Sequence, residues 1–273
     1  MSRSLEESTD DEYCVVVIPD AHATVGVSNE RFTMLGRLVC EVFSHVTTKC
    51  ALVSIGDLAD MTALGAWDKP GSKSFEGRRY FKDLEVCWDA QRKIFDEIDA
   101  YNRPRRGNAK LDIEFYWTLG NHEARIGRLL ESDPTRMEGI VSYDQLTNEG
   151  EFPWKVIPFL EPFFLAGVGF QHFWTSGVMS RAIGGEHQAA TILRKQMQSC
   201  VQGHTHTLDM ASRTRADGKK ITAAVVGCFF THIEEWAGPA NALWDPGVAV
   251  LHCKDGEFDF SWYSWRRIVD DFG

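Results

Sequence analysis

Residues 14–22 have the sequence CVVVIPDAH, in which a short apolar run stops at a polar loop. β-Branched residues dominate the run, and such a segment is typical of a strand that is buried on both faces. We therefore predict a strand over residues 14–19. Asp20 and His22 follow directly, at the carboxyl end of this strand.

The sequence that follows predicts a β-α-β unit. Residues 29–46 carry apolar side chains at helical intervals, and residues 51–55, ALVSI, predict a second buried strand. Crossovers of this kind almost always join parallel strands and place their carboxyl ends at one edge of the sheet. Gly56 and Asp57 are therefore expected at the edge that holds Asp20.

Three later segments repeat this arrangement of an apolar strand followed by a polar loop. They are residues 113–119 before Gly120, Asn121, His122 and Glu123, residues 164–170 before His172, and residues 200–202 before Gly203, His204, Thr205 and His206. Each loop taken alone is ordinary turn chemistry. With the earlier loop that holds His22, these loops nevertheless contain five of the nine histidines in the chain, and together they indicate a metal site.

The remaining segments predict helices, turns and one long loop. Helical periodicity covers residues 79–101 and 186–197, and Asp-Gly pairs at 217–218 and 255–256 predict two β-hairpins. Residues 61–81 have no clear period, and their length favours a functional loop beside the proposed site.

Composition limits the class of protein. With 273 residues and 44% hydrophobic content, the chain can bury one large core, so we expect a single domain at 13–273 after a disordered terminus at 1–12. The start of the chain is acidic and polar, and we find no apolar run that could cross a bilayer, so we expect a cytoplasmic protein without membrane contact. The net charge of −10 opposes a general grip on nucleic acid.

The seven cysteines are widely spaced and form no C-x-x-C pair. Most of them lie in apolar segments, which favours reduced thiols in the core over a zinc-thiolate site.

The ordered motifs resemble those of the calcineurin-like metallophosphoesterase superfamily, and the chain is most similar to its small members from bacteria and bacteriophages. The five blocks are Asp20-Ala21-His22, Gly56-Asp57-Leu58-Ala59-Asp60, Gly120-Asn121-His122-Glu123, His172, and Gly203-His204-Thr205-His206. One departure is Phe173, which stands where many relatives have glycine after the fourth block. The resemblance implies an α/β fold, a four-layer α/β/β/α sandwich of two mixed β-sheets flanked by helices.

The resemblance also implies two divalent metal ions. It places one ion on Asp20, His22 and His206 and the other on Asn121, His172 and His204, with Asp57 bridging the two. Carboxylate, imidazole and amide ligands without thiolate suit manganese, our first candidate, as well as iron, zinc or nickel. Two such ions about 3.5–4 Å apart can hold a bridging hydroxide and clamp an in-line displacement at phosphorus.

Further residues receive roles through the resemblance. His122 matches the histidine that protonates the leaving group, so Asp57, Asn121 and His122 form the expected catalytic set; the alternative for His122 is loop packing. Asp60 and Glu123 are expected either to orient ligands or to be solvated loop carboxylates.

Four more side chains have two interpretations each. Arg125 and Arg181 can bind phosphate or form surface salt bridges. Trp67 and Trp174 can stack on a base, but packing is the favoured role for both.

Three functions compete at this point. The first is a phosphodiesterase or phosphatase whose substrate is a phosphate ester such as a nucleotide. The second is a manganese-dependent nuclease acting on DNA or RNA, which needs a basic groove. The third is a non-catalytic metal-binding scaffold, which the complete ligand set disfavours. The sequence does not give the oligomeric state.

Overall fold

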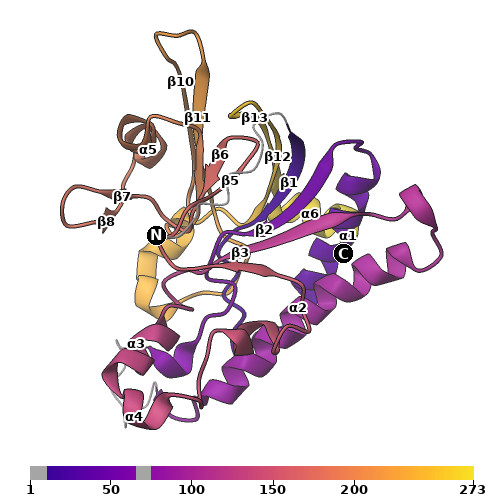
Figure 1. The fold of residues 1–273 in the computed structure, drawn as a ribbon. Coiled ribbons are helices and arrows are strands. Elements are labelled where there is room, and N and C mark those ends of the chain that lie inside the picture. The colour runs from indigo at the N-terminus through magenta and orange to yellow at the C-terminus, as the bar shows by residue number, and fades with distance from the viewer. Residues whose placement is uncertain (1–10, 66–74) are drawn as a thin grey trace.

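The computed structural model describes residues 11–65 and 75–273, and its largest element is a six-stranded mixed sheet (Figure 1). The strand order is β13-β12-β1-β2-β3-β4. The parallel strands are β1 (Glu12–Ile18), β2 (Lys49–Ser54), β3 (Ile113–Thr118) and β4 (Lys155–Ile157). β12 (Gly247–Lys254) runs antiparallel to β1, and β13 (Glu257–Ser264) runs antiparallel to β12.

A second mixed sheet has five strands in the order β10-β11-β9-β6-β5. Its three central strands are parallel: β11 (Lys220–Val226), β9 (Cys200–Gln202) and β6 (Val168–Phe170). The antiparallel outer strands are β10 (Leu208–Thr214) and β5 (Phe163–Leu165). A separate small hairpin joins β7 (Thr175–Ser176) to β8 (Arg181–Ala182).

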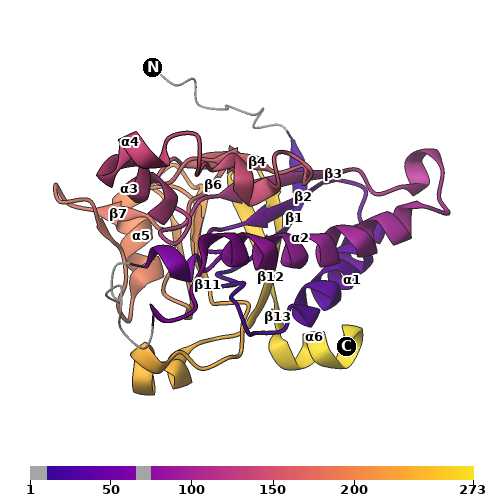
Figure 2. The same cartoon turned by 90° about the horizontal axis from the view of Figure 1, so that it is seen from below.

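Helices cover both sheets on their outer sides. α1 (Glu30–Ser44), α2 (Tyr80–Asn102) and α6 (Trp265–Phe272) lie together, whereas α5 (Gln188–Gln196) lies far from them beside the second sheet (Figures 1 and 2). Short helices α3 (Arg125–Ser132) and α4 (Pro134–Met137) follow β3. The 3-10 segments are η1 (Thr62–Leu64), η3 (Gly107–Ala109), η4 (Asp144–Thr147) and η5 (Glu235–Leu243).

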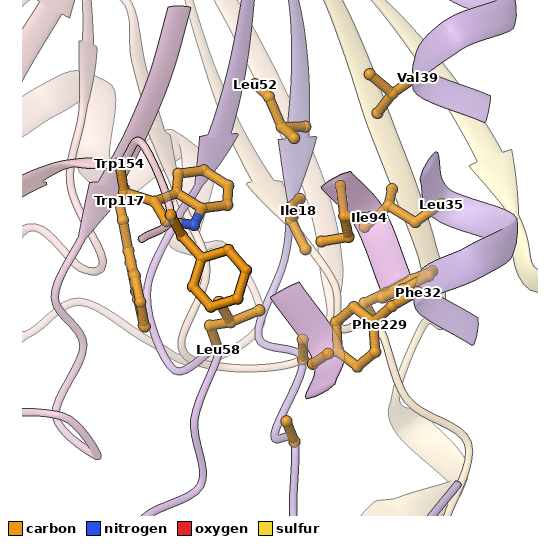
Figure 3. Close-up of a cluster of buried hydrophobic side chains, with 14 of the residues drawn as sticks. Ile18, Phe32, Leu35, Val39, Leu52, Leu58, Ile94, Trp117, Trp154 and Phe229 are labelled. Atoms are coloured by element: carbon orange, nitrogen blue, oxygen red, sulfur yellow. The ribbon is translucent and has the colours of Figure 1, made fainter. Parts of the chain in front are cut away.

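Strand alternation divides the apolar residues among three interfaces. In β1, Cys14, Val16 and Ile18 face α1 and α2, where Ile18 lies among side chains such as Phe32, Leu35 and Ile94 (Figure 3). Tyr13, Val15 and Val17 face the opposite way and pack between the two sheets. A third cluster joins α5 to the outer face of the second sheet. This succession of helices, sheet, sheet and helix confirms the predicted α/β sandwich.

The predicted β-α-β unit and both Asp-Gly hairpins are present. The strand predicted over residues 164–170 was wrong, because the chain turns at Ala166 and Gly167 and forms the antiparallel pair β5 and β6. β1 begins at Glu12, within the terminus that we predicted to be disordered, and residues 1–10 lie outside the described part. Residues 66–74 of the predicted 61–81 loop, including Trp67, also lie outside it.

All seven cysteines are free and buried, as predicted for core thiols. Burial raises the pKa of Cys40 and Cys50 to about 11 and the pKa of Cys14, Cys200 and Cys228 to about 12. Within the described ranges, no helix is long and apolar enough to cross a membrane.

Candidate metal centre

The loops after five parallel strands meet where the carboxyl edges of the two sheets converge. Backbone hydrogen bonds join the first two loops, since the amides of Ala21 and His22 donate to the Asp57 carbonyl at 3.0 and 2.9 Å. Hydrogen bonds also cross between the loops of the two sheets. The His204 amide donates to Asp20 Oδ1 at 2.8 Å, and His172 Nδ1 donates to the Ile55 carbonyl at 3.0 Å.

Asp20, His22 and His206 form a first buried group, with one ligand atom from each residue within 4.8 Å of the others. His206 Nε2 lies 3.2 Å from Asp20 Oδ2. Both Asp20 Oδ2 and His22 Nε2 are buried; among the described residues, His22 Nε2 has no hydrogen-bond partner and Asp20 Oδ2 has only the approach of His206. Because unsatisfied buried polar atoms are costly, a cation between them fits this donor set.

Asp57, His172 and His204 form another such group. His172 Nδ1 carries a proton and donates a hydrogen bond to the Ile55 carbonyl. Nε2 then faces two acceptors, Asp57 Oδ2 at 3.3 Å and Asn121 Oδ1 at 3.0 Å. This arrangement requires either a second proton on the ring or a cation beside it. Without metal, burial lowers the pKa of His172, but Asp57 and Asp20 outweigh it and raise the pKa to about 9.

The carboxylate of Asp57 lies between the two groups. Its Oδ1 accepts the His122 amide at 2.8 Å, while Oδ2 lies 3.8 Å from His122 Nε2 and 3.9 Å from His22 Nε2. His22, Asp57 and His122 thereby form a third possible ligand group. Burial alone would raise the pKa of Asp57, but His172 and His122 hold it well below its usual value.

Two of the histidines are held neutral, which is the form that binds metal. Burial and the neighbouring His172 lower the pKa of His204 to about 4. Burial and His122 likewise lower the pKa of His22.

Asp60 and Glu123 support the ligands. Asp60 Oδ1 accepts from His122 Nδ1 at 2.8 Å and lies 3.4 Å from His22 Nδ1, so it orients both rings. Glu123 is fully buried and accepts three amides, those of Asp57 and Ala59 at 3.0 Å and Gly120 at 2.8 Å. The alternative of solvated loop carboxylates is therefore wrong for both residues.

The backbone of the loops is shaped around the ligands. His22, Asp57, His204 and His206 have φ angles of 44°, 51°, 73° and 62°, a left-handed conformation that strains non-glycine residues and recurs at functional sites. Gly120 approaches the bridging carboxylate so closely that a Cβ there would lie 2.1 Å from Asp57 Oδ1.

Sequence reasoning missed the residues that enclose the first group. Phe230 and Trp244 pack against the His206 ring with centroids 5.1 and 4.7 Å away, and His232 packs on Phe230 while its Nε2 lies 2.9 Å from a Glu234 carboxylate oxygen. Arg31 donates to the Ala21 carbonyl at 2.9 Å. These residues belong to no strand-end motif, so no sequence signal marked them.

The structure distinguishes between the two predicted roles of Arg125 and of Trp174. Among residues 11–65 and 75–273, Arg125 has no salt-bridge partner; its Nη1 donates to the carbonyls of Asp60 and Met61 at 2.8 and 3.2 Å. Trp174 is buried and donates to the Val201 carbonyl, which confirms its packing role. Arg181 is exposed on β8.

A scan against protein-family models finds no match for this chain, and a search of curated proteins finds no significant match. The assignment of the site therefore rests on its own geometry. The site brings together every predicted ligand and can hold metal, since its buried His and Asp groups have their donor atoms close together.

Proposed function

We propose that the protein is a dinuclear metal-dependent phosphoesterase of the calcineurin-like metallophosphoesterase superfamily, acting as a phosphodiesterase or phosphatase. The observation that carries this proposal is the position of Asp57, whose carboxylate stands between two groups of metal-ligating side chains. Such a carboxylate can hold two cations close together, and paired cations are one arrangement that catalyses phosphoryl hydrolysis.

The ligands divide as their positions suggest. Asp20, His22 and His206 would hold one ion, and Asn121, His172 and His204 the other. Nitrogen and oxygen donors without thiolate keep manganese as the first candidate, with iron, zinc or nickel as alternatives. When bound, two cations lower the pKa of water and neutralise charge on the phosphoryl group.

His122 is the proposed general acid. Asp60 accepts a hydrogen bond from His122 Nδ1, which directs Nε2 toward Asp57 and the space beside the ligands. A second proton on Nε2 is then available for the leaving oxygen, and Asp60 stabilises the resulting imidazolium. Burial opposes this charge, but Asp57 and Asp60 raise the pKa of His122 above its ordinary value.

The test is hydrolysis of bis-p-nitrophenyl phosphate and p-nitrophenyl phosphate by chelator-stripped protein, with manganese, nickel, zinc and magnesium restored singly. We expect metal-restored cleavage, and faster cleavage of the diester would identify a phosphodiesterase. Tight binding of metal without cleavage of either ester by any metal would contradict the proposal and favour a scaffold.

A further inference from the structure

Three arginines gather on the His122 side of the metal centre. Arg78 precedes α2, and Arg125 and Arg128 lie in the first turn of α3. Each donates to a carbonyl of a ligand loop: Arg78 to Thr62 at 3.1 Å, Arg125 to Asp60 at 2.8 Å, and Arg128 to Asn121 at 2.9 Å. The loops that carry the metal ligands therefore also fix the guanidinium groups.

The three side chains are close to one another. A single point, the position of a Cβ on Gly65, lies 3.8 Å from Nη1 of both Arg78 and Arg125. Arg125 and Arg128 are three residues apart on one helix and thus neighbours on its surface. In a chain of net charge −10, this is a local concentration of positive charge beside the proposed site.

In the described part of the chain, two of these arginines form no close salt bridge, although Asp60, Asp57 and Glu123 attract Arg125 at longer range. Among the described residues, the salt bridges within 4.0 Å include neither Arg125 nor Arg128. Arg125 is also partly buried, and it donates to two carbonyls and to the His122 ring. A guanidinium has five N–H donors, so donors remain for an anion.

Arg125 lies beside the atom that would meet the leaving group. Its Nη2 is 3.2 Å from His122 Nε2, so Arg125 donates to this nitrogen while His122 is neutral and must release it when Nε2 takes up the proton for the leaving group. When His122 turns to a leaving oxygen, this N–H faces whatever that oxygen is bonded to. In a phosphoanhydride, that atom is a second phosphorus with its own anionic oxygens.

We propose that Arg78, Arg125 and Arg128 bind a second phosphoryl group on the leaving side, so that the substrate is a phosphoanhydride of the nucleoside-diphosphate kind. The inference rests on the proposed function. Guanidinium groups match phosphate oxygens with paired hydrogen bonds. A nucleic acid carries its next phosphate several bonds further away, and the acidic chain disfavours that partner.

The reaction is a hydrolysis that needs no other reactant. The oxygen of water bonds to the attacked phosphorus, the bond from that phosphorus to the bridging oxygen breaks, and its electron pair leaves on the second phosphate. His122 donates a proton to the leaving phosphate, and one proton of the water later replaces it on His122. The other proton of the water passes to solvent. The arginines neutralise the charge that builds up on the leaving phosphate.

The experiment compares ADP with bis-p-nitrophenyl phosphate, which has no second phosphoryl group, on the manganese-loaded full chain. Arg125→Gln should lower the ratio of kcat/KM for ADP over the diester at least tenfold, Arg125→Lys should restore part of it, and Arg128→Gln should lower it at least threefold. Arg194→Gln is the matched control, because Arg194 is exposed on α5 and bonds Thr191. Equal loss on both substrates would overturn the inference.

Binding supplies a second readout. By calorimetry, the loaded protein should bind methylenediphosphonate at least tenfold more tightly than methylphosphonate, and Arg125→Gln should remove most of this difference. An unchanged difference would refute the arginine subsite, as would faster cleavage of a DNA dinucleotide than of ADP. Failure of the proposed function itself would give a different result from both, because the protein would then not hydrolyse bis-p-nitrophenyl phosphate with any metal.

Discussion

At the scale of single residues, Asp57 is the side chain on which both proposed ions depend. Asp57→Asn should lower the metal content of both positions, because a neutral amide bridges two cations poorly. Elemental analysis after dialysis should show fewer than one ion per chain in the variant against about two in the parent, as expected for a two-metal site. Asp217→Asn, in the exposed hairpin turn, is the control. Unchanged content in Asp57→Asn would refute the bridging role.

His122 should act on the leaving group without holding the metal. His122→Ala should keep its metal and slow turnover by about 10²–10⁴-fold, the range of general acid catalysis, most strongly for esters with poor leaving groups. A series of aryl phosphate diesters measures this dependence. If activated and unactivated esters lose rate equally, His122 is not the acid.

His172 predicts the pH dependence of the metal-free protein. Its pKa of about 9 lies above the ordinary value of 6.5, so the stability it contributes is complete below pH 6.5 and is lost as the pH rises toward 9. Urea unfolding of chelated protein should show a fall on the order of 1–3 kcal/mol across this window. His172→Gln should flatten the profile, and a parallel profile in that variant would contradict the assignment.

At the scale of elements, α1 and α2 come into close contact at Gly36. A Cβ at this position would lie 2.8 Å from the Cβ of Glu97 and 2.9 Å from the carbonyl oxygen of Ile94. Gly36→Ala should therefore lower the free energy of unfolding by about 1–3 kcal/mol through overpacking, although alanine favours helix by about 1 kcal/mol. Urea unfolding measures the change. Metal affinity should stay unchanged, and a more stable variant would show that the helices can separate without cost.

The elements that could be predicted are those whose signal is local. β1 and β2 are β-branched apolar runs that end at polar loops, and α1 has a clear apolar stripe. The turn between β5 and β6 escaped prediction, because Ala166 adopts a φ of 46° inside an apolar run and only Gly167 marks it. The conformation of this turn therefore depends on tertiary contacts around Ala166 and Gly167 and not on a local sequence signal.

The ligands of the site were predictable for the same reason, since each follows a strand. The wall made by Phe230, Trp244 and His232 was not, because it depends on how the segment after β11 folds back over His206. The number of hydrogen bonds that Glu123 accepts likewise follows from two loops meeting, those after β2 and β3, which no single segment of sequence records.

At the scale of the whole molecule, the proposed ions stand where the two sheets meet. Asp20 and the Ile55 carbonyl belong to loops of the six-stranded sheet, while His204 and His172 belong to loops of the five-stranded sheet. Ligands from both sheets surround the same site, so binding of a cation should hold the sheets together and oppose unfolding of the whole chain.

The seven buried cysteines make that coupling measurable as a labelling rate. Thiol reagents attack the exposed thiolate, and these thiols are both shielded and held protonated, so the native chain should be silent to Ellman's reagent. Labelling would then occur only in molecules that unfold, so the rate of colour development measures the rate of unfolding. The labelling rate should fall on addition of manganese. A single cysteine engineered on the surface would be the one site that a thiol-reactive dye labels in the folded protein.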